Sequence, residues 1–327
     1  MRYLSASELN RALPMHVCIE AMEKVFADAA NAITPERIFM RQPRPGTDVD
    51  AWLGAMPGGW IGHGFGAKVV SLVADNPAAG RAGIQGVAVL LDPQTGAPTL
   101  LTDAATLTTR RTAAMAGLAT RSLARQDAHR LAVIGTGALA ADMISAVCAT
   151  RSIATVALNN RTPAKAERLA AELQGSITAE LSVERCAETA AAGADILVLC
   201  TTAAKPVVED GAIRPGTHIN AVGNFSPEGN ELELATVARA ELWVDTFEGA
   251  LSEAGEIIKA IQAGLIGTGT TDLRGDLAAI ATAAGSLRDS DDAITLYKSV
   301  GTALADIGAM VAATEVAERD NLGTILD

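Results

Sequence analysis

A glycine-rich turn has the residue types and spacing of a nucleotide-binding motif. It follows the apolar run Leu131–Ile134 and opens an apolar stretch that continues to Cys148. In a strand–turn–helix context, the GxGxxA pattern lets the first glycine form the tight turn and the second leave room for a pyrophosphate. Free N–H groups and the dipole of the following helix favour an anion there. The dinucleotide-binding residues predicted here are Gly135, Thr136, Gly137, Ala138 and Leu139, followed by Ala140 as the small residue of the helix.

The end of the next apolar run indicates which dinucleotide binds. Enzymes that use NAD usually place an acid there for the ribose 2′-hydroxyl. This chain has Asn159-Asn160-Arg161-Thr162 instead, with no acid. A guanidinium and a hydroxyl suit a 2′-phosphate. The sequence therefore favours NADP(H) at Asn160, Arg161 and Thr162, with NAD(H) as the alternative.

Composition excludes several other functions. The 327 residues are 49% hydrophobic and 20% charged, as expected of a globular chain long enough for two domains. Acidic residues outnumber basic ones by 38 to 26, and the net charge of −12 disfavours nucleic-acid and anionic-membrane partners. The chain starts without a signal-like apolar core and contains no run of about 18 apolar residues, so we expect a cytoplasmic protein. The four cysteines lack CxxC spacing and the four histidines lack metal-site spacing, so no metal is expected.

The elements that must hold the glycine turn alternate regularly after residue 126. Short apolar runs separated by helical stretches predict a parallel sheet covered on both faces. The predicted strands are Leu131–Ile134, Thr155–Leu158, Ile196–Cys200, His218–Val222 and Leu242–Val244. The fold class predicted is α/β, with a Rossmann dinucleotide-binding domain over residues 127–296.

The first part of the chain has a different texture. A capping box at Ser5 and Glu8 starts one helix, and Val17–Ala30 predicts another. Short β-type runs follow, including Gly66–Ala74 and Gly86–Leu91, before a helix over Thr108–Ala124. A last helix is expected at Leu296–Ala317. Residues 1–126 with 297–327 are therefore expected to form a second, α+β domain for substrate binding and dimerisation.

Several segments together resemble the ornithine cyclodeaminase/mu-crystallin family. They occur in order along nearly the whole chain, which makes the set more specific than any single motif. They are Met56-Pro57, Gly66–Val70, Arg111–Ala114, the glycine turn, Ile219–Gly223, Val244–Thr246, Glu253–Glu256 and Tyr297–Gly301. The resemblance implies a Rossmann domain plus a dimerisation and substrate domain, and hydride exchange at an imine or amine carbon beside a carboxylate.

The resemblance also implies three cationic site residues. Family pattern places the substrate carboxylate against positions that correspond here to Arg37, Lys68 and Arg111. Lys68 lies in an apolar strand, where an unpaired amine would be costly. Arg111 falls in a predicted helix, and its neighbour Arg110 points about 100° away from it. Arg41 and Arg44 lie near Arg37, which leaves the loop alignment open.

Two departures from the family pattern bear on the reaction. The cyclodeaminase has a glutamate two residues before the Met-Pro pair and an aspartate after Val-Gly-Gly; here these positions are Gly54 and Phe225. Without either carboxylate, little remains to bind a second amine. The run Asn224–Pro227 and the segment Val244–Ala250 look most like the family's bacterial cyclic ketimine reductases.

Other positions carry weaker expectations. The resemblance places Thr201, Thr202, Val222, Gly223 and Ser299 beside the cofactor. Asp245 and Glu253 fit either the site or structural roles. His16, His63, His129 and His218 are isolated and are interpreted as structural or exposed.

The resulting hypothesis is NAD(P)H-dependent reduction of a cyclic ketimine carboxylate by a homodimer. The substrate would be 1-pyrroline-2-carboxylate or 1-piperideine-2-carboxylate, and the product the L-amino acid. The alternatives are an acyclic imine reductase or amino-acid dehydrogenase acting on iminosuccinate or alanine. A cyclodeaminase lyase and a non-catalytic binding protein remain as further alternatives.

Overall fold

The computed structural model describes residues 1–267 and 272–327 and divides into two compact units. Unit 1 comprises Met1–Arg111 with Thr302–Asp327, and unit 2 comprises Thr112–Gly301. The sequence-based boundaries fall after residues 126 and 296, whereas the chain passes between the two units after Arg111 and after Gly301. The first crossing falls inside the helix α3 (Ala104–Leu123), whose regular pattern carries no boundary signal.

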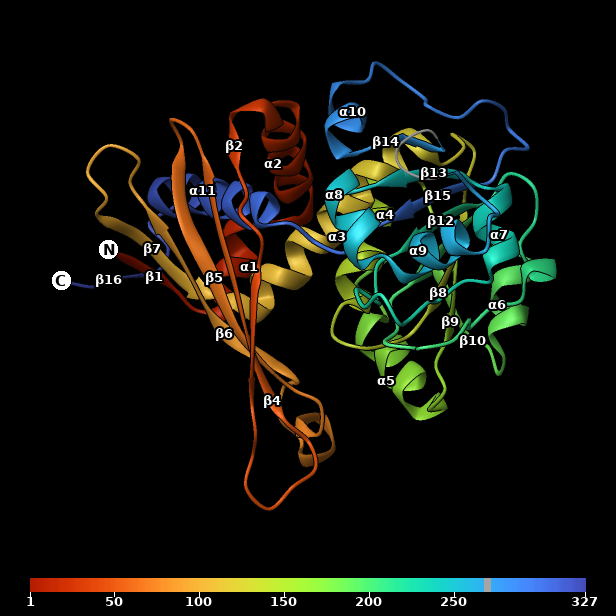
Figure 1. The fold of residues 1–327 in the computed structure, drawn as a ribbon, viewed down its shortest axis with the longest axis horizontal. Coiled ribbons are helices and arrows are strands. Elements are labelled where there is room, and N and C mark those ends of the chain that lie inside the picture. Colours follow the sequence, from red (N-terminus) through yellow and green to blue (C-terminus); the bar gives the residue numbers. More distant parts are fainter. Residues whose placement is uncertain (268–271) are drawn as a thin grey trace. The chain divides into compact units, whose positions relative to one another are not determined.

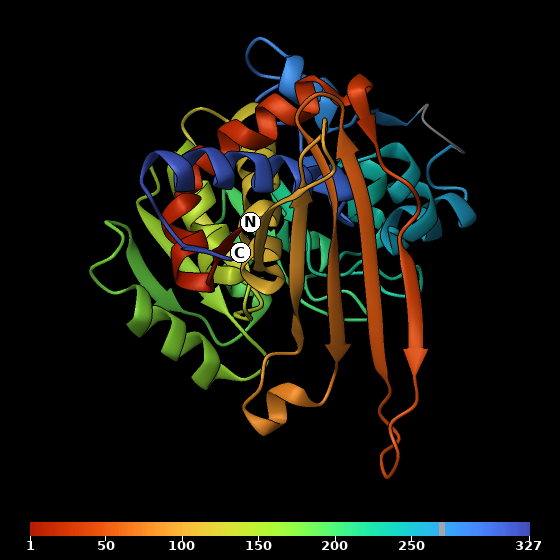
Figure 2. The same ribbon diagram turned by 90° about the vertical axis from the view of Figure 1, so that its left-hand side faces the viewer.

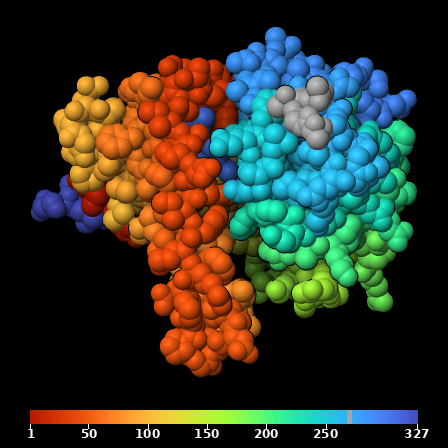
Figure 3. Space-filling view, in the orientation of Figure 1, coloured from red at the N-terminus to blue at the C-terminus, as the bar shows by residue number. Residues whose placement is uncertain are grey.

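Unit 1 is built on a sheet whose described strands number eight (Figures 1 and 2). Apart from the parallel pair β1–β7, neighbouring strands run antiparallel. In spatial order the strands are β16 (Thr324–Ile325), β1 (Arg2–Leu4), β7 (Pro98–Asp103), β6 (Ile84–Leu91), β5 (Gly64–Val73), β4 (Ala51–Trp60) and β2 (Ala32–Ile33), with β3 (Ile38–Gln42) also paired to β4. The long strands β4, β5 and β6 extend into the orange projection in Figure 3.

Three helices accompany this sheet, and one of them lies very close to it. They are α1 (Ala6–Ala12), α2 (Met15–Ala27) and α11 (Ala303–Arg319). The helix α11 packs on α2, β4 and β5. A Cβ on Gly58 of β4 would come within 2.9 Å of the Ala303 Cβ, so glycine lets the start of α11 touch the strand. Residues 303–310 of α11 are all buried.

Unit 2 is a parallel sheet of eight described strands that carries its own core. The strand order is β10 (Glu180–Val183), β9 (Thr155–Asn159), β8 (Arg130–Ile134), β11 (Ile196–Leu199), β12 (His218–Ala221), β15 (Thr295–Lys298), β13 (Glu241–Val244) and β14 (Leu273–Gly275). All the neighbouring pairs are parallel. The chain order around β8, with β9 and β10 on one side and β11 and β12 on the other, is that of a Rossmann fold.

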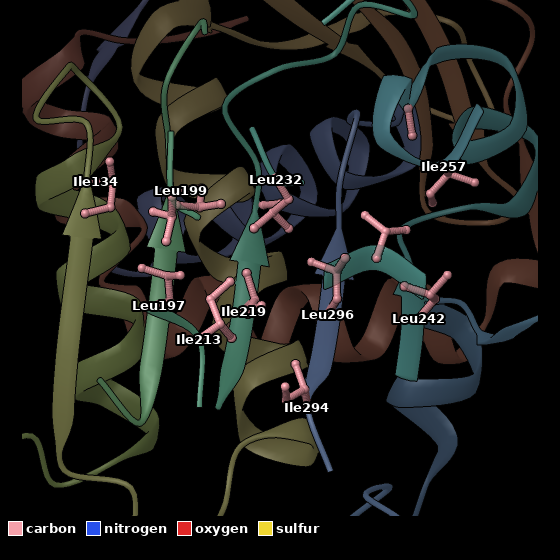
Figure 4. Packing of buried hydrophobic residues seen from close by; sticks show 14 of the residues in the cluster. Ile134, Leu197, Leu199, Ile213, Ile219, Leu232, Leu242, Ile257, Ile294 and Leu296 are labelled. Carbon is pink, nitrogen blue, oxygen red and sulfur yellow. The ribbon is translucent and has the colours of Figure 1, made fainter. Parts of the chain in front are cut away.

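Helices of unit 2 supply the apolar residues that cover this sheet. The helices are α4 (Ala140–Thr150), α5 (Pro163–Leu173), α6 (Ala187–Ala192), α7 (Leu234–Arg239), α8 (Phe247–Glu253), α9 (Gly255–Gln262) and α10 (Leu277–Thr282). Figure 4 shows part of one core cluster, where Leu197, Ile219 and Leu296 from adjacent strands lie beside one another. Burial of such continuous apolar strands is what a covered parallel sheet requires.

The α/β fold class and the five predicted strands of the Rossmann unit are confirmed, but the start of the last helix was predicted wrongly. Residues Thr295–Lys298 are a fully buried strand between β12 and β13, and α11 begins only at Ala303. The apolar periodicity of a buried strand and of a helix cannot be told apart over four residues. Similarly, α2 ends at Ala27, short of the predicted Ala30.

The described residues contain neither a helix suited to crossing a membrane nor a cluster suited to binding a metal ion. None of the helices there combines the length and the hydrophobicity needed to cross a membrane. The same part of the chain contains no cluster of three or more His, Cys, Asp or Glu side chains that could hold a metal ion.

Candidate active site

The glycine turn of unit 2 has the geometry that a pyrophosphate needs. Gly135 has a φ of +97°, and a Cβ there would lie 2.8 Å from the Cys200 carbonyl oxygen, so only glycine fits. Gly137 is the opposite case, because a Cβ on it would meet nothing within 4 Å. The space beside Gly137 is therefore open at the start of α4, and Ala140 is fully buried where the helix begins. The residues present fit a dinucleotide at this turn.

The end of β9 lies next to this turn. Asn160 donates from Nδ2 to Thr136 Oγ1 at 2.9 Å, which ties the second strand to the glycine turn. The Thr162 N–H donates to Asn160 Oδ1 at 2.9 Å and holds the loop. Arg161 and Thr162 are exposed, and Arg161 makes no hydrogen bond or ion pair with any described residue. The guanidinium is thus accessible from solvent.

A buried carboxylate that the sequence analysis missed organises the ends of β11 and β12. Glu231 is fully buried and accepts from Thr201 N at 2.7 Å, Thr201 Oγ1 at 2.8 Å, Gly223 N at 2.8 Å and Asn224 N at 3.0 Å. Burial raises the pKa of Glu231, while Lys298 and the Thr201 hydrogen bonds act in the opposite direction. Glu231 therefore fixes the two loops in which Thr201, Val222 and Gly223 were predicted to contact the cofactor.

Two other acids hold the end of β15. Lys298 lies 3.0 Å from Glu256 Oε2 and donates to the Asn224 carbonyl oxygen at 2.7 Å. Asp245 accepts from the Ser299 hydroxyl at 2.8 Å and from the N–H groups of Val300 and Gly301 at 2.8 and 2.6 Å. Asp245 is therefore an anchor for this segment, and the Ser299 side chain is buried against it.

In unit 1, the structure brings Lys68 and Arg111 together on a third residue, Asp306. The Lys68 Nζ lies 2.9 Å from Asp306 Oδ2 and 3.1 Å from Oδ1, and Arg111 Nε donates to Asp306 Oδ1 at 3.0 Å. Lys68 comes from β5, Arg111 from α3 and Asp306 from α11, and their exposed fractions are 2%, 4% and 1%. Two buried cations share one carboxylate, so cations outnumber acids among these three residues.

The charges around Lys68 set its proton affinity. Burial lowers the pKa of Lys68 from 10.5 to about 8; Asp306 counters this, and Arg111 and Arg37 lower it further. Arg37 is thus close enough to act on Lys68 electrostatically, and it is half-buried. Its guanidinium also lies 5.7 Å from the centre of the Phe39 ring. Of the three cations predicted from the sequence, Arg37 and Arg111 both lie close enough to Lys68 to lower its pKa.

The other arginines considered from the sequence have different partners. Arg110 donates to the carbonyl oxygens of Leu13 at 2.8 Å and Asn10 at 3.3 Å, so it docks against the end of α1. Arg41 pairs with Asp50, and Arg44 lies 2.6 Å from Asp75.

The remaining sequence candidates are scattered. His218 is fully buried with its Nδ1 2.9 Å from Thr295 Oγ1, and burial lowers its pKa to about 3, so it is a neutral core residue. His63 stacks on Trp60, and His16 and His129 are exposed. Thr202 is exposed after β11, and Phe225 is 39% exposed after β12.

One sequence signal could have identified Asp306, but none points to Glu231. Asp306 is the single charged residue in the apolar stretch Ala303–Ala313. An isolated acid on a buried helical face needs a cationic partner. Glu231 lies in an irregular loop between β12 and α7, where no periodicity reveals its burial.

The chain is similar to known proteins over nearly its whole length. The model of the ornithine cyclodeaminase/mu-crystallin family matches residues 2–321. A Delta(1)-pyrroline-2-carboxylate reductase of Bacillus cereus (strain ATCC 10987 / NRS 248) is 35% identical over 311 residues, which cover 94% of each chain.

Solved structures with the same fold include complexes with nicotinamide cofactors. The Thermococcus litoralis Delta(1)-pyrroline-2-carboxylate reductase, in complex with NADH and L-proline, has a TM-score of 0.92 and 33% identity over the full length of both chains. An archaeal alanine dehydrogenase dimer with bound NAD has a TM-score of 0.89 and 28% identity, covering 100% of this chain and 99% of that one. The family match and the full-length identity together show that this chain belongs to the ornithine cyclodeaminase/mu-crystallin family.

Proposed function

We propose that the chain reduces a small cyclic imino acid with NAD(P)H. The substrate is 1-pyrroline-2-carboxylate or 1-piperideine-2-carboxylate, and the product is L-proline or L-pipecolate. The observation that carries the proposal is the buried cluster of Lys68 and Arg111 on Asp306, with Arg37 nearby. Its surplus of positive charge suits one carboxylate, which is the anionic group of both substrates. The similar reductases of Bacillus cereus and Thermococcus litoralis support the same reaction.

The surface next to Lys68 supports a ring rather than a second charged group. On the inward face of the sheet, Met56 pairs with Lys68, and Gly54 pairs with Val70 two residues further along. A Cβ on Gly54 would lie 3.1 Å from the Phe39 ring and 3.4 Å from Val70, so an acidic side chain does not fit there unless Phe39 moves. The space that a carboxylate would need for a second amine is filled by apolar groups. This argues against cyclodeaminase activity.

The chemistry needs little from the protein beyond binding, orientation and a proton. The glycine turn at Gly135–Leu139 would hold the reduced nicotinamide cofactor, which would supply the hydride for the imine carbon, and the electron pair of the C=N π bond would pass to nitrogen. Arg111 and Arg37 would bind the carboxylate and fix the plane of the ring. Lys68 would hold a proton at Nζ beside the substrate, which favours the iminium form over the neutral imine. The iminium carbon is the better hydride acceptor.

For the nucleotide, the unpaired Arg161 at the end of β9 favours NADP(H), because a guanidinium binds a 2′-phosphate well. The solved relatives hold NADH or NAD, which keeps NAD(H) as the alternative. The absence of an acid at Asn160 is the argument for the phosphate.

The acyclic alternative is less well supported. Iminosuccinate has a second carboxylate, which would need one more cation, such as Arg41 or Arg44. Both already pair with acids of their own unit, Asp50 and Asp75. Binding a dicarboxylate at either arginine would require breaking an existing ion pair.

Turnover with a panel of substrates tests this function. We expect rapid oxidation of NADPH, followed at 340 nm, with 1-pyrroline-2-carboxylate or 1-piperideine-2-carboxylate, and slower oxidation of NADH. Iminosuccinate and pyruvate with ammonia should be poor substrates. Turnover of an acyclic imine without turnover of either ring would overturn the substrate and leave the cofactor unaffected.

We also infer that the chain forms a homodimer through the outer face of the unit 1 sheet. Antiparallel sheets usually alternate apolar and polar residues, with one face solvated. Here the face opposite Lys68 carries several exposed apolar side chains, namely Ile38 (61%), Met40 (49%), Phe65 (41%) and Val87 (49%). An apolar sheet face of this kind is typical of an interface. The related alanine dehydrogenase is described as a dimer.

A charge in the centre of this face tests the dimer. We expect Val87→Asp to convert the protein from dimer to monomer at micromolar concentration in sedimentation velocity, because a buried unpaired carboxylate opposes association. Leu265→Asp, at a residue of unit 2 that is 48% exposed, is the control and should leave the sedimentation coefficient unchanged. A wild-type monomer would contradict the inference.

A further inference from the structure

We propose that Asp306 is a positioning residue that keeps Lys68 protonated and aligned with Arg111 for the substrate carboxylate and imine nitrogen. The proposal rests on the proposed function and adds a residue to it. Asp306 contacts no substrate in this account and acts through its two cationic partners, Lys68 and Arg111.

The geometry gives Asp306 a defined position. Its two oxygens lie 3.1 and 2.9 Å from Lys68 Nζ, and Oδ1 also accepts from Arg111 Nε at 3.0 Å. Arg111 meets Asp306 through its Nε, while Lys68 reaches the same carboxylate from β5. Asp306 therefore sets the orientation of both cations with one group.

The position of Asp306 is itself fixed by packing. Ala303, one turn before Asp306, contacts β4 at Gly58, where a Cβ would leave only 2.9 Å. Gly308, two residues after Asp306, lies against Val25 of α2, with 2.6 Å from its ideal Cβ to Val25 Cγ1. A helix held at both points cannot shift its carboxylate away from β5 without losing packing.

Lys68 has charged neighbours from three directions and neutral ones from two. Its partners across β4 and β6 are Met56 and Ala88, which do not titrate. The ionisable groups that act on it are Asp306 from α11, Arg111 from α3 and Arg37 before β3. Among these, Asp306 is the one that favours the protonated amine, and burial together with both arginines opposes it. Without Asp306, burial and the two arginines remain, and all of them lower the pKa of Lys68.

The expected consequence is a shift in pH dependence. If the protonated amine is the active form, activity falls as the pH rises through the pKa of Lys68, which is about 8. In Asp306→Asn, we expect this alkaline limb to move down by at least one pH unit, with kcat/KM at pH 7.5 at least tenfold lower. A purely structural role would lower stability and leave the limb in place.

Direct titration of Lys68 separates this proposal from the proposed function. The chain has only six lysines, so lysine labelled with ¹³C at Cε gives few NMR signals, and Lys68→Arg assigns the one of interest. We expect the Lys68 signal to titrate near pH 8 in the wild type and at least one unit lower in Asp306→Asn. No substrate enters this measurement, so it stands even if the ketimine is not turned over.

Two further variants complete the test. Arg111→Gln removes a neighbouring cation and should move the Lys68 titration upward, opposite to Asp306→Asn, which keeps the proposal testable if Asp306→Asn does not fold. Glu256→Gln, in the other buried lysine–acid pair, should leave the Lys68 titration unchanged. An unchanged Lys68 titration in Asp306→Asn, or in Arg111→Gln, would overturn the proposal.

Discussion

Arg111→Ala is expected to lower kcat/KM for 1-pyrroline-2-carboxylate by roughly 10- to 100-fold, mainly through an increase in KM of at least tenfold. A hydrogen bond to a charged group contributes about 1.5–3 kcal/mol, and each 1.4 kcal/mol corresponds to about a factor of ten. Arg111 is 4% exposed and fixed on Asp306, so a flexible surface cation cannot replace it. Steady-state kinetics at several substrate concentrations measure the effect.

The neighbouring arginine is the matched control for this variant. Arg110 lies on the same helix and docks on the carbonyl oxygens of Asn10 and Leu13. Arg110→Ala should leave KM within about twofold of the wild type, since it removes a contact of α1 and no ligand. Equal kinetic losses in the two variants, or none in Arg111→Ala, would exclude Arg111 from the site.

Gly137→Val is expected to raise the dissociation constant for NADPH and NADH by at least about 100-fold while the fold stays intact. The second glycine of the turn allows the backbone to approach the pyrophosphate, and a branched side chain occupies that space. A Cβ at Gly137 meets no protein atom within 4 Å, so the free protein has room for it. Fluorescence titration of reduced cofactor and thermal melting measure the two quantities separately.

Gly193→Val provides the comparison within the same unit. Gly193 lies after α6, and a Cβ on it also meets nothing within 4 Å. This variant should bind cofactor like the wild type. Undiminished cofactor binding by Gly137→Val would mean that the dinucleotide does not approach the turn as proposed.

Much of the fold follows from local sequence patterns. The strands of the Rossmann unit are short apolar runs flanked by helices, and each predicted run became a strand. The capping box at Ser5 and Glu8 is also present, with both reciprocal hydrogen bonds. These features are visible because the residues that stabilise them are near one another in sequence.

The wrong prediction at Thr295–Lys298 arises because its structure depends on residues that are distant in sequence. Thr295–Lys298 becomes a strand because two distant strands, β12 and β13, leave a place between them. The turn signals around it do not contain that information, and the run was predicted as the start of a helix. Tertiary context outweighs local propensity at such a position.

The site shows the same division. The types and order of Arg37, Lys68 and Arg111 are in the sequence, and a family resemblance suggests their roles. Asp306, the partner that Lys68 and Arg111 share, is 238 residues from Lys68, and no local pattern predicts that pairing. The contact depends on how closely α11 packs on β4 and β5. The structure therefore adds what the sequence does not show, namely that tertiary packing places Asp306 against Lys68 and Arg111.

Deuterium transfer is the most direct test of imino acid reduction. NADPH or NADH deuterated at both C4 positions would be supplied with 1-pyrroline-2-carboxylate, and the product analysed by mass spectrometry and NMR. We predict L-proline with a single deuterium at Cα, formed in equal amount to the cofactor oxidised. Proline made from ornithine without net cofactor oxidation, or cofactor oxidation without label at Cα, would contradict the account.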